Sequence, residues 1–199
     1  MRPILRGRDI KRYGYNFADL YLITTFPSLK IDIEKYPAIK QHLLIFGYDR
    51  LKQTGEKGSR KKTNNKWFET QDTISYWEDF YKQKIVWTPV NSEYRFAFVP
   101  EGIFFNNSLF MMIGKHLKYL LSLFNSKLFI FYLDKILANG NYTYGSGETF
   151  KNTTVPYPTI DIEQQFEKLL EMQQYNEIDK LIYDLYELSK EEIEFIESL

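Results

Sequence analysis

The stretch LKYLLSLFNSKLFIFYLDKIL, residues 117–137, is the strongest structural signal in the chain. Its apolar side chains recur at steps of three and four residues, at Leu117, Leu120, Leu121, Phe124, Leu128, Phe131, Tyr132 and Ile136. This spacing places them on one face of an α-helix, which Phe129, Ile130 and Leu133 widen. We therefore predict one long helix over residues 117–137, buried on most of its circumference and ended by Asn139-Gly140.

Short apolar runs before this helix predict β-strands, because they are rich in β-branched and aromatic residues. The runs are LYLITTF at 20–26, KIVWTPV at 84–90, RFAFV at 95–99, IFF at 103–105 and LFMMI at 109–113. Pro100-Glu101-Gly102 predicts a turn, and two or three of the strands around it should pair as antiparallel neighbours. Pro37 suits the first turn of a further helix, which Gly47 weakens.

Acidic helices should follow residue 160. Asp161 is the expected cap of the first, and Ser189-Lys-Glu-Glu192 has the form of a capping box. The whole pattern predicts a mixed α/β (α+β) fold, with a small, mostly antiparallel or mixed sheet, packed helices and a C-terminal helical segment. We divide the chain into a body, residues 1–160, and an acidic helical tail, residues 161–199.

The net charge of zero hides an asymmetry between these two parts. The tail carries 12 acids and three bases, a net charge of −9, so the body carries +9. A basic body favours an anionic partner, whereas the acidic tail should stay away from one. The tail also has an apolar face, which predicts packing against the body or against another protein domain.

The most basic part of the body is the segment RLKQTGEKGSRKKTNNK, residues 50–66, called the cationic segment below. It holds seven Lys and Arg residues, a single acid, Glu56, and almost nothing apolar. Because it has no apolar face to bury, it predicts an exposed, mobile loop. Such a loop suits a polyanion, since each phosphate that it neutralises releases condensed counterions. The alternative is a loop that is merely solvated.

Several kinds of chemistry are excluded or disfavoured by the sequence. There is no cysteine, so disulfides and thiolate metal sites are excluded, and the two histidines, His42 and His116, are far apart. No apolar run reaches the ~18 residues of a membrane span, and a cytoplasmic location is expected. Asp9-Ile-Lys11 matches half of a metal-nuclease motif, but no acid precedes Asp9. We expect no catalysis by this chain.

Five segments resemble, in the same order, the motifs of TaqI-like specificity domains. They are LRGRDIKRY at 5–13, KWFETQDT at 66–73, KIVW at 84–87, KYLLSLFNS at 118–126 and IYDLYELSKEEI at 182–193. Such domains are the C-terminal target-recognition domains of adenine-specific DNA methyltransferases and type IIG restriction–modification enzymes. The resemblance implies that residues 1–160 recognise double-stranded DNA sequence-specifically.

The resemblance also implies a parent enzyme. That parent would be an adenine-specific methyltransferase with or without a fused endonuclease, using S-adenosylmethionine and, for cleavage, Mg²⁺. This sequence lacks the N-P-P-Y motif and the glycine-rich loop of the methyltransferase. We therefore expect a fragment or a stand-alone specificity module that has no cofactor of its own and works with a catalytic domain in cis or in trans.

Candidate DNA contacts lie in three polar segments, because Arg and Lys suit phosphates and guanine whereas Asn suits adenine. The candidates are Arg6, Arg8, Lys11 and Arg12; Arg60, Lys61, Lys62, Asn64, Asn65 and Lys66; and Asn139, Asn141, Tyr142, Tyr144 and Ser146. Structural alternatives stay open: Arg8 can pair with Asp9, and the two tyrosines can pack on Pro156 and Pro158.

Three other functions remain open at this point. The first is a specificity-subunit module of a type I restriction system, which also binds DNA. The second, from another class, is a small metal-dependent nuclease that uses Asp9 and Lys11. The third is a protein-interaction module whose working surface is the acidic tail.

Overall fold

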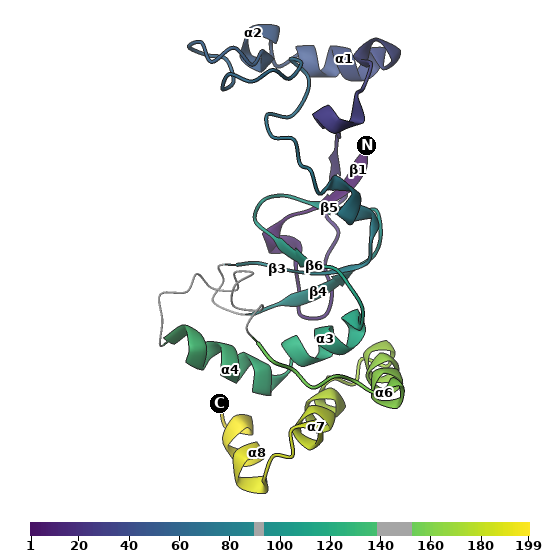
Figure 1. Cartoon of the computed structure of the whole chain (residues 1–199), viewed down its shortest axis with the longest axis vertical. Helices are drawn as coiled ribbons and strands as arrows, with labels where there is room; N and C mark the ends of the chain where they lie inside the picture. Colours follow the sequence, from purple (N-terminus) through teal and green to yellow (C-terminus); the bar gives the residue numbers. More distant parts are fainter. Residues whose placement is uncertain (90–93, 139–152) are drawn as a thin grey trace. The chain divides into compact units, whose positions relative to one another are not determined.

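A computed structural model describes residues 1–89, 94–138 and 153–199, except for the side chains of residues 136–138 (Figure 1). Seven α-helices and two three-stranded sheets make up this part of the chain, which confirms the α+β class. The strands are β1 Arg2–Leu5, β2 Tyr21–Leu22, β3 Lys84–Trp87, β4 Phe96–Val99, β5 Phe104–Phe105 and β6 Phe110–Met112. The helices are α1 Pro37–Leu44, α2 Tyr48–Leu51, α3 Leu117–Phe124, α4 Lys127–Ala138, α6 Ile160–Glu171, α7 Tyr175–Leu185 and α8 Lys190–Glu197.

The chain forms two compact units. Unit 1 consists of Met1–Arg2 and Leu22–Glu78, and unit 2 consists of Pro3–Tyr21 and Asp79–Leu199. Unit 1 contains 11 bases and seven acids, a net charge of +4, and unit 2 therefore carries −4. Of the +9 carried by residues 1–160, unit 1 therefore holds +4, including the cationic segment, and the remaining +5 lies in unit 2, where the −9 of the tail outweighs it.

The sheet at the centre of unit 2 is antiparallel. Its middle strand, β3, pairs with β4 and β6, and Val86 lies opposite both Ala97 and Met111. All four side chains of β3 are buried, as expected for a short apolar run. In the other sheet, of order β2-β1-β5, strands β1 and β5 are parallel. The predicted antiparallel pairing is confirmed, although the strands divide between two sheets.

The long helix predicted over residues 117–137 is wrong in one respect: it is broken into α3 and α4 at Asn125 and Ser126. The Asn125 side chain accepts a hydrogen bond from Phe96 N (3.2 Å) and donates one to Phe96 O (2.9 Å), so it binds the backbone of β4. Ser126 Oγ accepts from Phe129 N at 3.1 Å and so caps α4. Asn125 is thus bonded to β4 and Ser126 to the first turn of α4 at the point where the helix breaks.

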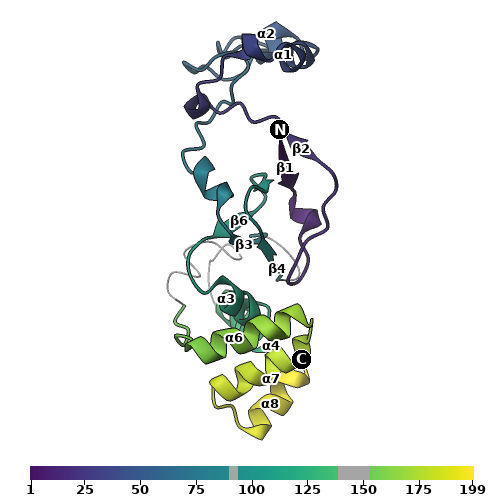
Figure 2. The same ribbon diagram turned by 90° about the vertical axis from the view of Figure 1, so that its right-hand side faces the viewer.

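The C-terminal helices pack on these two helices, with α6 against α3, and α7 and α8 against α4 (Figure 2). Thr159, not Asp161, caps α6, because its Oγ1 accepts from Ile162 N; Asp161 lies in the first turn. The capping box of Ser189 and Glu192 at the start of α8 is confirmed. The acidic tail therefore buries its apolar face against the body. Phe166, for example, packs edge-on against Tyr119.

Unit 1 has little regular structure. The strand predicted at residues 20–26 is reduced to Tyr21–Leu22, and Pro27 starts a single 3₁₀ turn. The helix expected after Pro37 is present as α1. It ends before Gly47, whose φ of +89° turns the chain into α2.

Candidate nucleic-acid interface

The cationic segment folds back on itself as a hairpin-shaped loop. Arg60 N donates to Lys52 O (3.0 Å), Gly55 N donates to Arg60 O (2.9 Å), and Thr63 N donates to Gln53 O (3.1 Å). Apart from the end of α2, its residues are in neither helix nor strand, as predicted. These backbone bonds bring its two legs together, so the loop has a defined shape despite its polar composition.

Two buried polar side chains, Gln53 and Glu69, tie the base of this loop. Gln53 Nε2 donates to Lys66 O (3.0 Å) and to Glu69 O (2.8 Å), and Lys66 N donates to Glu69 Oε2 (2.7 Å). Gln53 is 6% exposed and Glu69 is 5% exposed. Sequence reasoning did not find them, because their partners are backbone groups that no spacing rule reveals.

Gly55 is required where the legs of the loop meet. Its φ is +77°, in the region that favours glycine, and a Cβ there would lie 3.1 Å from Lys62 Cβ and 3.3 Å from Lys62 N. A side chain would therefore be strained and would also push the leg that carries Lys62.

Some of the predicted DNA contacts in the cationic segment point inward. Arg60 Nη1 donates to Glu69 O (3.0 Å), and Asn65 Nδ2 donates to Thr70 O (2.9 Å) and Gln71 O (3.2 Å). Both side chains are half-buried. Their observed role is to hold the loop, and a contact with DNA remains a prediction for them.

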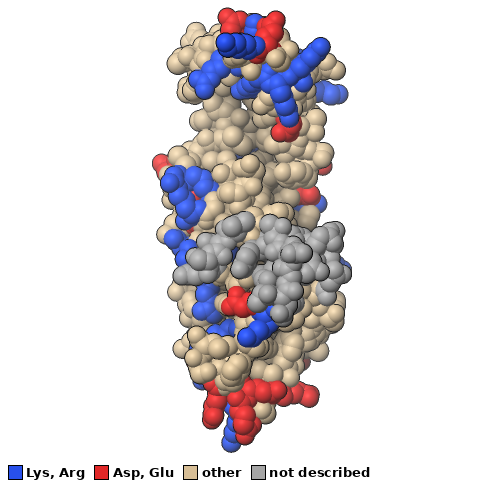
Figure 3. All heavy atoms as spheres, turned by 90° about the vertical axis from the view of Figure 1, so that its left-hand side faces the viewer, with Lys and Arg blue, Asp and Glu red and all other residues tan. Residues whose placement is uncertain are grey.

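Other cations of the segment face solvent. Lys57, Lys61, Lys62 and Lys66 are exposed, as are Arg50 and Asn64. Lys61 pairs with Asp72 at 2.7 Å, whereas within the described residues Arg50, Lys57 and Lys62 take part in no ion pair. Figure 3 shows Lys and Arg side chains, with a few acids among them, gathered over unit 1 at the top of the view. An exposed cation without an acidic partner is free to bind phosphate.

In the first candidate segment, Asp9 pairs with Arg6, and the alternative pairing with Arg8 is not present among the described residues. Arg6 donates Nε to Oδ2 (3.0 Å), Nη2 to Oδ1 (2.8 Å) and its backbone N to Oδ2 (2.8 Å). The hydrogen bonds from Arg6 lower the pKa of Asp9. Arg8 and Lys11 are exposed, and the described structure gives them no ion pair. They are the outward cations of this segment.

The carboxylate of Asp9 is therefore occupied on both oxygens. A metal nuclease would need these oxygens for its ion. Within the described residues, no group of three or more His, Asp or Glu side chains is placed to hold a metal. Asp9 thus forms a structural ion pair with Arg6, and Lys11 is an exposed lysine two residues further on.

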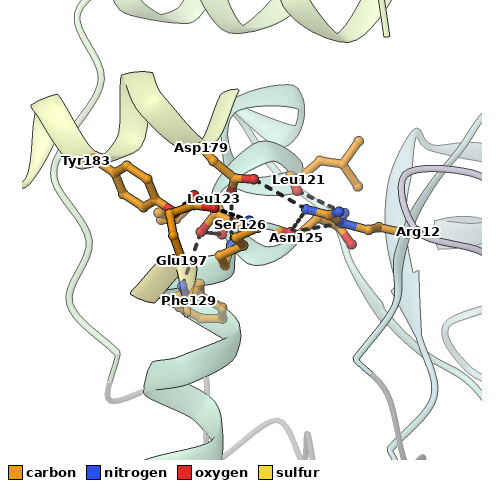
Figure 4. A network of polar contacts seen from close by, with 10 residues as sticks. Arg12, Leu121, Leu123, Asn125, Ser126, Phe129, Asp179, Tyr183 and Glu197 are labelled. Carbon is orange, nitrogen blue, oxygen red and sulfur yellow. Dashed lines mark hydrogen bonds and ion pairs between the residues drawn. The ribbon is translucent and has the colours of Figure 1, made fainter. Parts of the chain in front are cut away.

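Arg12 belongs to a polar network inside unit 2 (Figure 4). Its guanidinium donates to Asn125 O from Nη2 (2.6 Å) and Nε (3.1 Å), and Nη2 lies 3.8 Å from Asp179 Oδ2. Lys127 N donates to the other Asp179 oxygen at 2.9 Å. Burial raises the pKa of Asp179, and these donors oppose that rise. Arg12 thus ties the N-terminal loop to the break between α3 and α4 and to α7.

The third candidate segment, with Asn139, Asn141, Tyr142, Tyr144 and Ser146, lies outside the described residues.

A family model described as the TaqI-like C-terminal specificity domain matches residues 2–145, most of the chain. The chain belongs to this family. A search of curated proteins found no significant match. The TaqI-like specificity domain indicates recognition of DNA sequence in restriction–modification enzymes, and a specificity domain is not itself catalytic. No helix in the described part of the chain is long and apolar enough to span a bilayer.

The motifs by which this TaqI-like domain can be recognised in sequence mostly build its scaffold. Gly7 lies against Ser108, whose Oγ accepts from Gly7 N at 3.0 Å. The ring of Tyr13 stacks on Tyr175 at 4.1 Å between centroids. Lys84 is fully buried. These motif residues therefore serve the internal packing of unit 2, whereas the exposed cations Arg50, Lys57, Lys61 and Lys62 lie between the motifs in sequence.

Proposed function

We propose that this chain is the DNA-reading domain of an adenine-specific methyltransferase, with or without a fused endonuclease. The single observation that carries the proposal is family membership over residues 2–145. The net charge of +4 on unit 1 supports it, since a duplex attracts cations at every phosphate. A catalytic domain in cis or in trans would supply the methyl transfer and bind S-adenosylmethionine.

The cationic segment suits the role of a phosphate grip in this proposal. Its tip carries Lys57, and the leg that returns carries Lys61 and Lys62, all exposed. Contacts from such side chains to phosphates set the register of a protein on the duplex. Base reading then requires side chains held in fixed positions, and the exposed Asn64 beside this grip is a candidate for adenine.

Selection from a random duplex library tests the proposal. The full chain is first incubated with the library at about 50 mM salt, at which phosphate contacts are strong. Washing at higher salt then weakens non-specific binding, and the DNA that stays bound is sequenced. We expect enrichment of one short motif that contains adenine, the base that the parent would methylate. A bound pool with the same composition as the input would contradict sequence-specific recognition.

Replacing Gln53 with leucine should weaken DNA binding without changing any charge. The substitution removes the donor to Lys66 O and Glu69 O, so the free loop is less ordered. Ordering it on the DNA then costs conformational entropy, which lowers the affinity. We expect about a tenfold loss of affinity, equivalent to about 1.4 kcal/mol. Fluorescence anisotropy with the selected duplex measures it. The matched control is Gln83→Leu at an exposed glutamine of unit 2, which should bind as the unaltered chain does.

A further inference from the structure

The corner between α1 and α2, residues 44–48, presents large apolar side chains to solvent. Ile45 is 80% exposed, Tyr48 is 53% exposed and Phe46 is 52% exposed. None of the eight side chains of α1 is buried in the described structure. Contiguous patches of exposed apolar side chains mark binding surfaces, whereas single ones are ordinary.

Backbone hydrogen bonds hold the corner in a defined turn. Ile45 N donates to Gln41 O (3.2 Å) and His42 O (3.3 Å), and Phe46 N donates to Leu43 O (3.1 Å). Gly47 then reverses the chain with a φ of +89°. The peptide groups of the corner are hydrogen-bonded, so its side chains project from a fixed base.

Beside the corner lies an open pocket of about 520 Å³. Its apolar lining is Leu43, Phe46 and Leu51, and Arg50 and Arg60 also line it. Gly58 and Ser59 of the cationic loop complete the lining, so the corner and the loop tip are neighbours within unit 1. An apolar tip with arginines beside it is complementary to a polyanion that has an apolar interior, which describes stacked DNA bases between phosphates.

We infer that the α1–α2 corner is a wedge that inserts Ile45, backed by Phe46, between two base pairs of the bound duplex. Arg50, which is exposed and lines the same pocket, would then hold a phosphate beside the opened step. Apolar wedges that enter a base step unstack it and bend the helix. This inference rests on the proposed function and adds to it a deformation of the target, by which sequence can be read without hydrogen bonds to bases.

The test uses the full chain and the selected duplex, labelled at both ends for energy transfer and carrying 2-aminopurine at successive positions. The unaltered chain should shorten the end-to-end distance and brighten 2-aminopurine at one step. Ile45→Ser should lose both signals and bind about tenfold more weakly. Because Ile45 is 80% exposed, this substitution spares the core. The matched control is Ile160→Ser, at an isoleucine of α6 that is 75% exposed, which should retain both signals.

The outcomes separate the wedge from the proposed function. If Ile45→Ser binds, bends and unstacks the duplex as the unaltered chain does, the wedge is wrong while DNA recognition stands. Weaker binding with unchanged bending also overturns insertion, because the corner would then touch DNA without opening it. A chain that binds no duplex at all would contradict the proposed function itself, and the wedge with it.

Discussion

Reversing three charges of unit 1, in the variant R50E/K57E/K62E, should weaken DNA binding by about 100-fold at 100 mM salt. These three side chains are exposed and are in no ion pair within the described residues, so each is available to a phosphate. Arg60 is left intact because its bond to Glu69 O shapes the loop. The loss should therefore report the missing charges and not a change in loop structure.

The dependence on salt is the sharper measurement. The logarithm of the binding constant falls linearly with the logarithm of salt concentration, and each phosphate contact adds about 0.9 to the slope. Removing three contacts should make the slope shallower by about 3. Anisotropy titrations between 50 and 200 mM salt, with the selected duplex, give both the affinity and the slope.

The matched control changes the same amount of charge in unit 2. Lys115, Lys168 and Lys190 are exposed, and the described residues give them no ion pair, so K115E/K168E/K190E also lowers the net charge by six. Lys168 and Lys190 lie in the acidic tail. The Asp and Glu side chains of the tail gather at the bottom of the view in Figure 3. Equal losses in the two triple variants would show a general effect of net charge and would contradict the assignment of the cationic segment.

The sequence predicted those features that depend on local pattern. The buried strand KIVW and the apolar stripe of residues 117–137 are both visible as runs and spacings. The break at Asn125 is not, because it depends on the backbone of β4, 29 positions earlier in the chain. Polar side chains in the middle of a helical pattern are thus ambiguous until their tertiary partners are known.

The candidate site shows the same division. Composition identified the cationic segment, but it could not separate Arg60, which bonds inward, from Lys62, which faces solvent. It also could not find Gln53, whose role comes from two carbonyl groups 13 and 16 positions away. Charge density locates a surface, whereas hydrogen-bond partners decide which of its residues are free to act.

Replacing Lys84 with methionine should destabilise unit 2 by about 3 kcal/mol. Lys84 is fully buried, and its Nζ donates to three backbone carbonyls, those of Phe80 (2.9 Å), Lys82 (2.9 Å) and Pro100 (3.1 Å). Methionine has a similar shape but no donor, so three acceptors lose their partner. Relief of the buried charge offsets part of that cost. Urea denaturation followed by circular dichroism measures the change, with Lys82→Met as the control at an exposed lysine, where about 1 kcal/mol or less is expected.

The dependence of this difference on pH reports the protonation state of Lys84 in the folded chain. Burial lowers the pKa of Lys84 to about 8, and the unfolded chain should titrate near the ordinary value of about 10.4. Between these values the folded state binds fewer protons than the unfolded state, so the Lys84 contribution to stability rises with pH. The gap in unfolding free energy between the unaltered chain and Lys84→Met should therefore be constant below pH 8 and widen from pH 8 to 9.5. A gap that stays constant over this range would mean that Lys84 keeps its proton in the folded chain. The hydrogen bonds to the three carbonyls would then raise the pKa by at least as much as burial lowers it.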